Sequence, residues 1–309
     1  MMNSETKTGR VLALGFFDGV HLGHGALLKR TAEVAAQTGA MPCAMTFDTH
    51  PEALITKTPL PLLNTVSDRV EMIRRLYGIE EVIFAHFDDA LMHMSWQSFI
   101  QAMLIDCFHA THVVAGHDFH FGYKGKGNPV LLAQECARLG LGCDIIPCVE
   151  MENITISSTY IRKLVAQGDM ERAAHFLGHP HGMSGIVGHG QKLGSLLGVP
   201  TVNLSLPEGL QCPAHGVYAS VAYTDDGEAR PAVTNIGLRP TVTVSQEVTM
   251  ETHILDFSGN LYGRPLRLEL LKFLRPEARF ASLEELKLQI SSDIDEARAY
   301  QACIRRGNL

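Results

Sequence analysis

His21 and His24 are the side chains whose type and spacing first suggest chemistry in this sequence. They end the stretch Gly15-Phe16-Phe17-Asp18-Gly19-Val20-His21-Leu22-Gly23-His24, which directly follows the apolar run of residues 11–14. The pattern predicts a strand, a tight glycine turn and a helix that opens on the two histidines. A helix start offers unpaired backbone N–H groups and a partial positive charge, so a polyphosphate can bind there. The three-residue spacing sends both imidazoles to one side, where they could stabilise charge on a phosphorus during substitution.

A glycine-rich turn that carries two surface histidines is the competing interpretation, because two histidines three residues apart are by themselves a weak motif. The position of the stretch favours a ligand site. In a parallel α/β fold, ligands bind at the carboxyl ends of the strands, and these residues follow the first strand.

Five strands alternate with helices over the first half of the chain. Apolar patterning predicts the strands at residues 11–14, 41–47, 81–87, 111–115 and 143–148. Apolar residues at helical spacing lie between them and again up to residue 177. Predicted helix N-caps are Ser95, for a helix through residue 104, Asn128, with proline at the first helical position, and Ser158. This alternation predicts an α/β fold with a doubly wound parallel sheet and right-handed crossovers.

Three further polar stretches lie at or just beyond strand ends. They are residues 46–51, 116–127 and 155–162, and together with residues 15–24 they can line one ligand crevice. The stretch 116–127 is rich in glycine, lysine and aromatic residues, which suits a phosphate and a flat ring. The nearby histidines mix strand and loop positions without a thiolate or carboxylate set, so we do not expect a metal there. These histidines are His109, His112, His117 and His120.

From residue 183 the pattern changes to short apolar runs separated by turn residues. Strands are predicted around 216–221, 232–233, 251–257 and 266–273, with Asp225-Asp226-Gly227 as a hairpin turn. A small antiparallel β-barrel buries such strands without open edges. A capping box at Ser282 starts a terminal helix whose apolar face packs on the barrel. That face comprises Leu283, Leu286, Ile290, Ile294 and Ala297. We therefore expect an N-terminal domain over residues 8–182 and a C-terminal domain over residues 183–309.

Thr201 and Asn203 stand out in the second half. Two residues apart in an extended segment, a hydroxyl and an amide oxygen point the same way, which suits Mg²⁺. Glu251 also stands out, on a predicted strand. The competing interpretation is that all three are ordinary strand residues.

Composition limits the class of protein. The chain has 309 residues, 46% of them hydrophobic, and a formal net charge of −7, so it can fill two cores but offers no basic field for nucleic acid. We see no apolar run long enough to cross a membrane and no leader sequence. The seven cysteines contain no C-x-x-C pair, which is typical of reduced thiols. We expect a cytoplasmic protein that acts on small molecules, and the sequence leaves its oligomeric state open.

The four polar stretches of the first half resemble, in this order, the adenylyltransferase module of bacterial bifunctional riboflavin kinase/FAD synthetases. The shared motifs are G-x-F-D-G-x-H-x-G-H, T-F-D/E-x-H-P, G-x-D-F-x-F-G and I-S-S-T-x-I-R, over residues 10–177. The resemblance implies FMN adenylyltransferase activity: the FMN phosphate attacks the α-phosphorus of ATP, pyrophosphate leaves, and FAD forms without a covalent intermediate. It implies that His21 and His24 stabilise the transition state while Mg²⁺ offsets phosphate charge. It assigns nucleotide binding to Phe16, Asp18, Gly23, His50, Asp118, Phe119, Gly122, Ser157, Ser158, Thr159 and Arg162.

Residues 183–300 are similar, block by block, to the riboflavin kinase domain of the same family. The blocks are P-T-x-N, N-I-G-x-R-P-T, the glutamate of the E-x-H-I-L-D-F strand, L-Y-G and F-L-R-P-E. This similarity implies transfer of the ATP γ-phosphoryl group to the riboflavin 5′-hydroxyl. Thr201 and Asn203 would hold Mg²⁺-ATP, Glu251 would be the general base, and Arg275 would lie near the flavin.

One position departs from the kinase pattern. The family usually has arginine where this chain has Ser195, and Lys192 could compensate. An FAD synthetase with weak or lost kinase activity is therefore an alternative. A flavin-sensing regulatory protein and a nucleotidylyltransferase for another phosphorylated alcohol are further alternatives.

Overall fold

The computed structural model describes residues 9–50, 53, 56, 58–188, 198–239 and 247–305. The chain divides into two compact units, Met1–Leu60 with Val66–Ser157, and Pro61–Thr65 with Ser158–Leu309. The domain boundary that we expect after residue 182 stays a prediction. In the described ranges, no helix combines the length and the apolar character that crossing a membrane requires.

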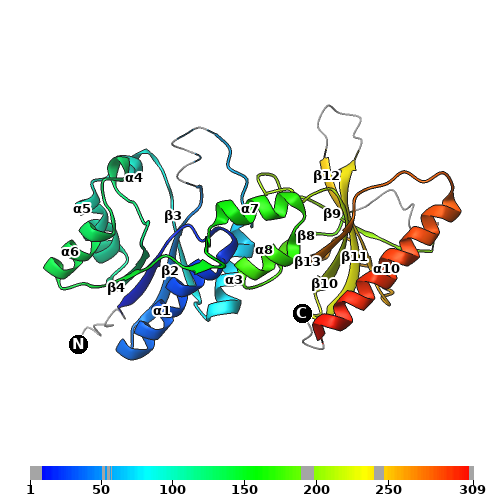
Figure 1. Ribbon diagram of the computed structural model, residues 1–309. Coiled ribbons are helices and arrows are strands. Elements are labelled where there is room, and N and C mark those ends of the chain that lie inside the picture. The colour runs from blue at the N-terminus through cyan, green and yellow to red at the C-terminus, as the bar shows by residue number, and fades with distance from the viewer. Residues whose placement is uncertain are drawn as a thin grey trace. The chain divides into compact units, whose positions relative to one another are not determined.

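A five-stranded parallel sheet organises the first unit, in the order β3-β2-β1-β4-β5 (Figure 1). Its strands are β1 (Arg10–Leu14), β2 (Met41–Phe47), β3 (Glu81–Ala85), β4 (Ala110–Gly116) and β5 (Gly142–Ile146). Because strand side chains alternate between faces, Val11 and Ala13 pack into one core while Leu12 and Leu14 pack into another. The predicted doubly wound α/β architecture is confirmed, with a core on each face of the sheet.

Helices of this unit cover both faces. They are η1 (Asp18–Val20), α1 (Leu22–Thr38), α3 (Val66–Tyr77), α4 (Asp89–His93), α5 (Trp96–Ser98), η2 (Phe99–Cys107), η3 (Tyr123–Gly125) and α6 (Pro129–Leu139). Helix α6 begins as the sequence predicts: Asn128 accepts a hydrogen bond from the Leu131 N–H, and proline takes the first helical position. The predicted helix over 95–104 is present, but its second part, η2, is a π-helix, which apolar spacing does not indicate.

Two short strands, β6 (Glu150–Met151) and β7 (Ile154–Thr155), form a hairpin that the sequence analysis did not predict. Its turn uses Glu152 and Asn153, both with positive φ, at 54° and 59°. Strands of two residues carry too little alternation to be read from a sequence.

A nearly closed barrel of six antiparallel strands organises the second unit, in the order β8-β13-β10-β11-β12-β9. Its strands are β8 (His181–Ile186), β9 (Val202–Ser205), β10 (Gly216–Tyr223), β11 (Ala229–Arg239), β12 (Glu247–Ile254) and β13 (Pro265–Arg275). A single bridge between Gly188 and Asn203 links the two ends of the sheet. The predicted antiparallel β-barrel is confirmed.

Within the described residues, three helices accompany this barrel: α7 (Ser158–Gln167), α8 (Met170–Leu177) and α10 (Leu283–Arg305). Helix α10 runs along β10 and β11 (Figure 1). Ser282 caps it, accepting a hydrogen bond from the Glu285 N–H. Of the predicted apolar face, Ala297 and Ile294 pack on the barrel, whereas Leu283 is exposed because it lies in the first turn, ahead of the packed part.

Candidate active sites

The two histidines meet at the start of α1. His21 is the N-cap residue, and its Nδ1 accepts a hydrogen bond from the backbone N–H of His24 at 3.2 Å. The two rings stack with their centroids 3.5 Å apart and an angle of 14° between their planes. Because Nδ1 of His21 accepts, the proton of the neutral ring sits on Nε2, which becomes a donor. The expectation that both imidazoles lie on the same side is met.

The turn before the pair has an unusual backbone. Phe17 and Val20 have φ of 59° and 43°, a region that non-glycine residues rarely occupy, and Gly19 has φ of 78°. This turn buries Asp18 and brings the chain from β1 into α1 within a few residues. Gly23 lies beneath the His21 ring, since a Cβ at this position would come within 3.1 Å of its Nδ1. The turn and the missing side chain together fix the place of His21.

The surroundings of His24 keep its ring uncharged. Burial, followed by the charges of His21 and Arg69, lowers the pKa of His24 well below its usual value, so the ring is neutral at neutral pH. Its Nδ1 is buried and has no hydrogen-bond partner among the described residues. A neutral imidazole carries no charge and offers one N–H donor.

Two side chains from other segments, His50 and Arg69, contact Phe16 of the motif. The rings of Phe16 and His50 make an edge contact with centroids 4.4 Å apart. The guanidinium of Arg69, on α3, also stacks on the Phe16 ring, with its Cζ 4.1 Å from the ring centroid. Sequence reasoning missed Arg69, because a charged residue in a helix is normally read as part of the solvated face.

An ion pair joins the ends of β2 and β3. His86 Nδ1 lies 2.5 Å from Asp48 Oδ2, and the other Asp48 oxygen accepts from the Phe87 N–H. The hydrogen bond lowers the pKa of Asp48 and raises that of His86. Sequence reasoning missed His86 too, since nothing near it forms a motif.

The stretch after β4 follows a strand adjacent to β1, so its first residues share the carboxyl edge of the sheet with residues 15–24. Phe119 is half-buried and stacks on Phe121, with centroids 5.4 Å apart. Gly122 has φ of 71°, and a Cβ there would come within 2.6 Å of the Trp96 nitrogen, so a larger residue would displace the loop. Asp118 is exposed.

The fourth stretch crosses the division between the units: Ser157 ends the first, whereas Ser158, Thr159 and Arg162 belong to the second. Helix α7 begins at Ser158 rather than being capped by it, a difference of one position. Arg162 is buried and its Nη2 donates to the Thr159 hydroxyl at 3.0 Å.

In the second unit, strand register lines up polar residues across the barrel. Asn203 of β9 pairs with Glu251 of β12, which pairs with Asn235 of β11. Asn235 pairs in turn with Val217 of β10, and Val217 with Arg275 of β13. Directly opposed residues share a face of the sheet, so this row places a carboxylate, two amides and a guanidinium on one side.

A cavity of about 340 Å³ opens over this row, between the barrel and α10. Its lining is apolar with a few convergent polar groups, as small-molecule sites usually are. Its polar lining comprises Thr201, Asn235, Glu251, His253, Arg275, Glu277 and Asp293. Arg275 donates through Nε and Nη2 to the buried Asp293 of α10, at 2.9 and 2.8 Å. Of the residues predicted for this half, Thr201, Glu251 and Arg275 therefore share one cavity.

A second cavity of about 340 Å³ adjoins the first through Thr201, which lines both. It is bounded by Phe257, Gly259, Leu261 and Tyr262. His253 Nδ1 lies 2.8 Å from the Pro200 carbonyl oxygen and so holds the segment that leads into Thr201. Sequence reasoning did not reveal that one threonine would join two cavities.

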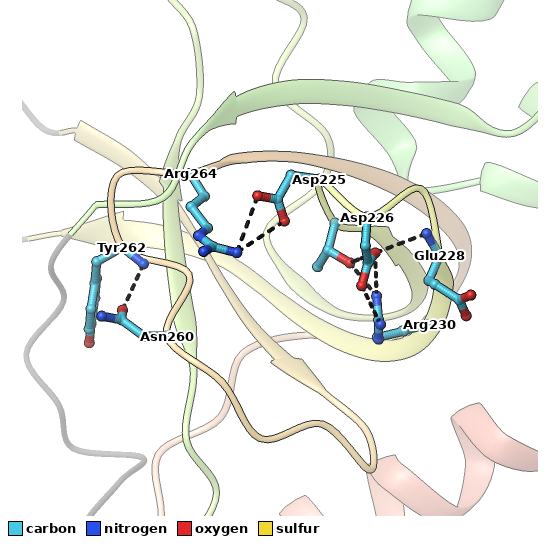
Figure 2. A network of polar contacts seen from close by, with 8 residues as sticks. Asp225, Asp226, Glu228, Arg230, Asn260, Tyr262 and Arg264 are labelled. Carbon is cyan, nitrogen blue, oxygen red and sulfur yellow. Dashed lines mark hydrogen bonds and ion pairs between the residues drawn. The ribbon is translucent and has the colours of Figure 1, made fainter.

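Polar contacts fix the turns near this second cavity, as Figure 2 shows. The Tyr262 N–H donates to the Asn260 side chain, and Arg264 pairs with Asp225 at 3.2 Å. In the β10–β11 hairpin, whose turn is where we predict it, Arg230 pairs with Asp226 at 2.7 Å. That hydrogen bond lowers the pKa of Asp226.

The oxygen donors of the second unit fit Mg²⁺. Thr201, Asn203 and Glu251 supply a hydroxyl, an amide oxygen and a carboxylate from two paired segments, and Mg²⁺ prefers such hard ligands. Among the described residues no group of three His, Cys, Asp or Glu side chains could hold a metal ion. Ser195, Lys192, Pro240 and Thr241 lie outside the described residues.

Comparison with known proteins assigns the two halves separately. A family model described as FAD synthetase matches residues 3–160, and one described as riboflavin kinase matches residues 177–301. The chain is 36% identical to the bifunctional riboflavin kinase/FMN adenylyltransferase of Pseudomonas fluorescens, covering 95% of this chain and 94% of that protein. It is 33% identical to the protein of the same name from Escherichia coli K12, covering 97% and 95%.

A crystal structure titled as a macrolide-efflux protein from Streptococcus pneumoniae superposes with a TM-score of 0.84 at 29% identity, covering 95% of each chain. The fold described above therefore recurs over nearly the whole length of a solved structure. Together with the matches to both halves, these similarities show that the chain belongs to the family of bifunctional riboflavin kinase/FMN adenylyltransferases.

Proposed function

We propose that this chain phosphorylates riboflavin to FMN and adenylylates FMN to FAD, using ATP in both reactions and one site in each unit. One observation carries the proposal: the stacked histidine pair and the Glu251 cavity lie in separate units, each inside the range that one family model matches.

In the first unit, an oxygen of the FMN phosphate attacks the α-phosphorus of ATP. A new P–O bond forms as the bond from the α-phosphorus to the bridging oxygen breaks, so pyrophosphate leaves with the electron pair. No proton has to be transferred. We assign His21 and His24 to the oxygens on which negative charge accumulates, because His21 presents Nε2–H and His24 presents a neutral donor.

We further assign ATP positioning to the residues around this pair. Phe16 and His50, which contact each other, would line the nucleotide site. Gly23, which has no side chain, would leave the helix start accessible beneath His21. Phe119 offers a flat surface for a ring, and Gly122 gives its loop the necessary turn. The remaining proposed nucleotide-binding residues of this unit are Asp18, Asp118 and Ser157, whereas Ser158, Thr159 and Arg162, which belong to the second unit, stay a prediction of the sequence.

In the second unit, the 5′-hydroxyl of riboflavin attacks the γ-phosphorus of ATP, and ADP leaves. We assign Glu251 as the general base that accepts the hydroxyl proton, because it lines the cavity beside α10. The flavin would occupy this cavity against Arg275, and ATP the adjoining one. Thr201, common to both, would then lie where the phosphate meets the hydroxyl.

We propose that Thr201 and Asn203 hold Mg²⁺ in this site, with Glu251 opposite them. When bound, the ion would offset the negative charge of the ATP phosphates. We also propose a cytoplasmic location, supported by the seven unpaired cysteines, and no role for nucleic acid, supported by the net charge of −7.

The test is a product assay on the full chain. Purified protein is incubated with riboflavin, ATP and Mg²⁺, and flavins are separated by chromatography over time. We expect FMN to appear first and FAD to follow. Accumulation of FMN without FAD would overturn the first-unit assignment, and absence of both products would overturn the whole proposal.

A further inference from the structure

Arg69 is a buried cation that the proposed chemistry has not yet used. It lies on α3, and none of its surface is exposed. Arginine is rarely buried completely, because removing a guanidinium from water is costly unless it gains partners. Its partners therefore indicate what it does.

The guanidinium bridges the ends of two strands at the carboxyl edge of the sheet. Its Nη1 donates to the Thr46 hydroxyl at 3.2 Å and to the Phe47 carbonyl oxygen at 3.3 Å, both at the end of β2. The Thr46 hydroxyl donates in turn to the Phe16 carbonyl oxygen at 2.9 Å, just beyond β1. The same guanidinium stacks on the Phe16 ring. One side chain thus ties the first residues of the histidine motif to the strand beside it.

The charge of Arg69 acts on two residues of the motif. Asp18, which is buried in the turn before the histidine pair, favours the charged form of Arg69 and opposes the burial that lowers the Arg69 pKa to about 10. Arg69 is therefore protonated at neutral pH. Its positive charge is one of the causes that lower the pKa of His24.

We propose that Arg69 is a positioning residue for adenylyl transfer: it holds Phe16 and Asp18 so that His21 and His24 keep their places at the start of α1. This inference rests on the function proposed above for the first unit. Because Arg69 acts through these residues, its loss should slow the chemical step more than it weakens ATP binding.

The test compares Arg69→Met, which removes the charge, with Arg69→Lys, which keeps it but loses the planar fork of donors. Arg75→Met is the matched control, since Arg75 lies on the same helix and is exposed. FAD formation from FMN is measured as kcat and KM for ATP between pH 5 and 9. Riboflavin phosphorylation and thermal unfolding are measured on the same full-length preparations.

For Arg69→Met we expect kcat to fall about 10- to 100-fold, with a smaller rise in KM for ATP because Phe16 and Asp18 are also proposed to bind the nucleotide, and with riboflavin phosphorylation unchanged. The acid limb of the kcat–pH profile, where kcat falls as the pH is lowered, should move to higher pH. The reason is that the Arg69 charge, which disfavours protonated His24, is gone. His21, which stacks on this ring, is the other group whose charge lowers the pKa of His24, and it is unchanged in these variants. Arg69→Lys should lower kcat but keep the original acid limb, and Arg75→Met should change neither.

Wild-type kcat in a folded Arg69→Met variant would overturn the inference, as would an unmoved acid limb. If Arg69→Met fails to fold, Arg69→Lys decides: a kcat equal to that of the original protein overturns the inference. An original protein that forms no FAD would instead overturn the proposed function itself.

Discussion

At the scale of single residues, His21 combines two roles that a substitution can separate. Its Nδ1 caps α1, while its Nε2–H is the donor that we assign to the proposed reaction. His21→Asn keeps a side-chain oxygen that can cap the helix, so we expect stability within about 0.5 kcal/mol of the original protein. The imidazole donor is lost, so kcat for FAD formation should fall roughly 100- to 1,000-fold.

The comparison variant is His21→Ala, which loses the cap as well. It should be less stable than His21→Asn by about 1 kcal/mol, measured by urea unfolding, yet equally slow in FAD formation. Full FAD synthesis by His21→Asn would show that the imidazole is not needed.

His181 predicts how the second unit responds to acid. This residue begins β8, only 4% of its surface is exposed, and its Nε2 has no partner among the described residues. Burial first, and the charge of His179 second, lower the pKa of His181 to about 4. The unfolded chain binds a proton near pH 6.5, whereas the folded protein does not bind it until about pH 4. The contribution of His181 to the free energy of unfolding is therefore complete above pH 6.5 and is lost as the pH falls from 6.5 to about 4.

The size of this loss follows from the shift, and is on the order of 3 kcal/mol. We expect His181→Leu to reduce the fall in unfolding free energy between pH 7 and pH 4 by about this amount, measured by urea unfolding with circular dichroism. His175→Gln, at an exposed position on α8, is the control and should leave the fall unchanged. An unaltered pH dependence in His181→Leu would contradict the account.

At the scale of elements, the predictable parts were those that local patterns encode. Alternating apolar residues give the strands, and Asn128 with Pro129 marks the start of α6. The π-helix η2, the two-residue strands β6 and β7, and the burial of Arg69 depend on tertiary packing that no local pattern records. Leu283 is an error in the other direction. The helical spacing predicts that Leu283 packs on the barrel, but it lies in the first turn of α10, ahead of the packed part, and is exposed.

The contact between α10 and β13 yields a prediction about the cavity in which we propose that the flavin binds. Asp293 of α10 accepts from Arg275 and from Gln289, and its carboxylate is buried. Asp293→Asn removes the charge that offsets the guanidinium, so we expect the second unit to lose about 3 kcal/mol of stability. Because Arg275 would no longer be held in the cavity wall, KM for riboflavin should rise.

Asp295→Asn, at an exposed position on the same helix, is the matched control for this change. FAD formation from FMN should be unaffected in both variants, since that reaction is assigned to the first unit. An unchanged KM for riboflavin in Asp293→Asn would exclude a role of this pair in flavin binding.

At the scale of the whole molecule, the sequence predicted the two architectures and the motifs that belong to each. The motif residues around His21 could be found because they are contiguous or follow successive strands. The row from Asn203 through Glu251 to Arg275 could not be found in this way, because it depends on strand register. The two cavities that share Thr201 likewise follow from the closed barrel and not from any one segment.

The central claim is that the two reactions use independent sites, one in each unit. His21→Asn should convert riboflavin to FMN and stop there. Glu251→Gln should phosphorylate riboflavin about 100- to 10,000-fold more slowly while it still converts added FMN to FAD. Glu284→Gln, an exposed carboxylate at the start of α10, is the control and should perform both reactions.

The most direct measurement mixes the two variants. Folded His21→Asn and Glu251→Gln are combined with riboflavin, ATP and Mg²⁺, and FAD is followed by chromatography. We expect the mixture to form FAD from riboflavin, because FMN made by one variant is released and adenylylated by the other, while neither variant alone does so at a comparable rate. Failure of the mixture to form FAD, or loss of both reactions in either folded variant, would contradict the assignment of one site to each unit.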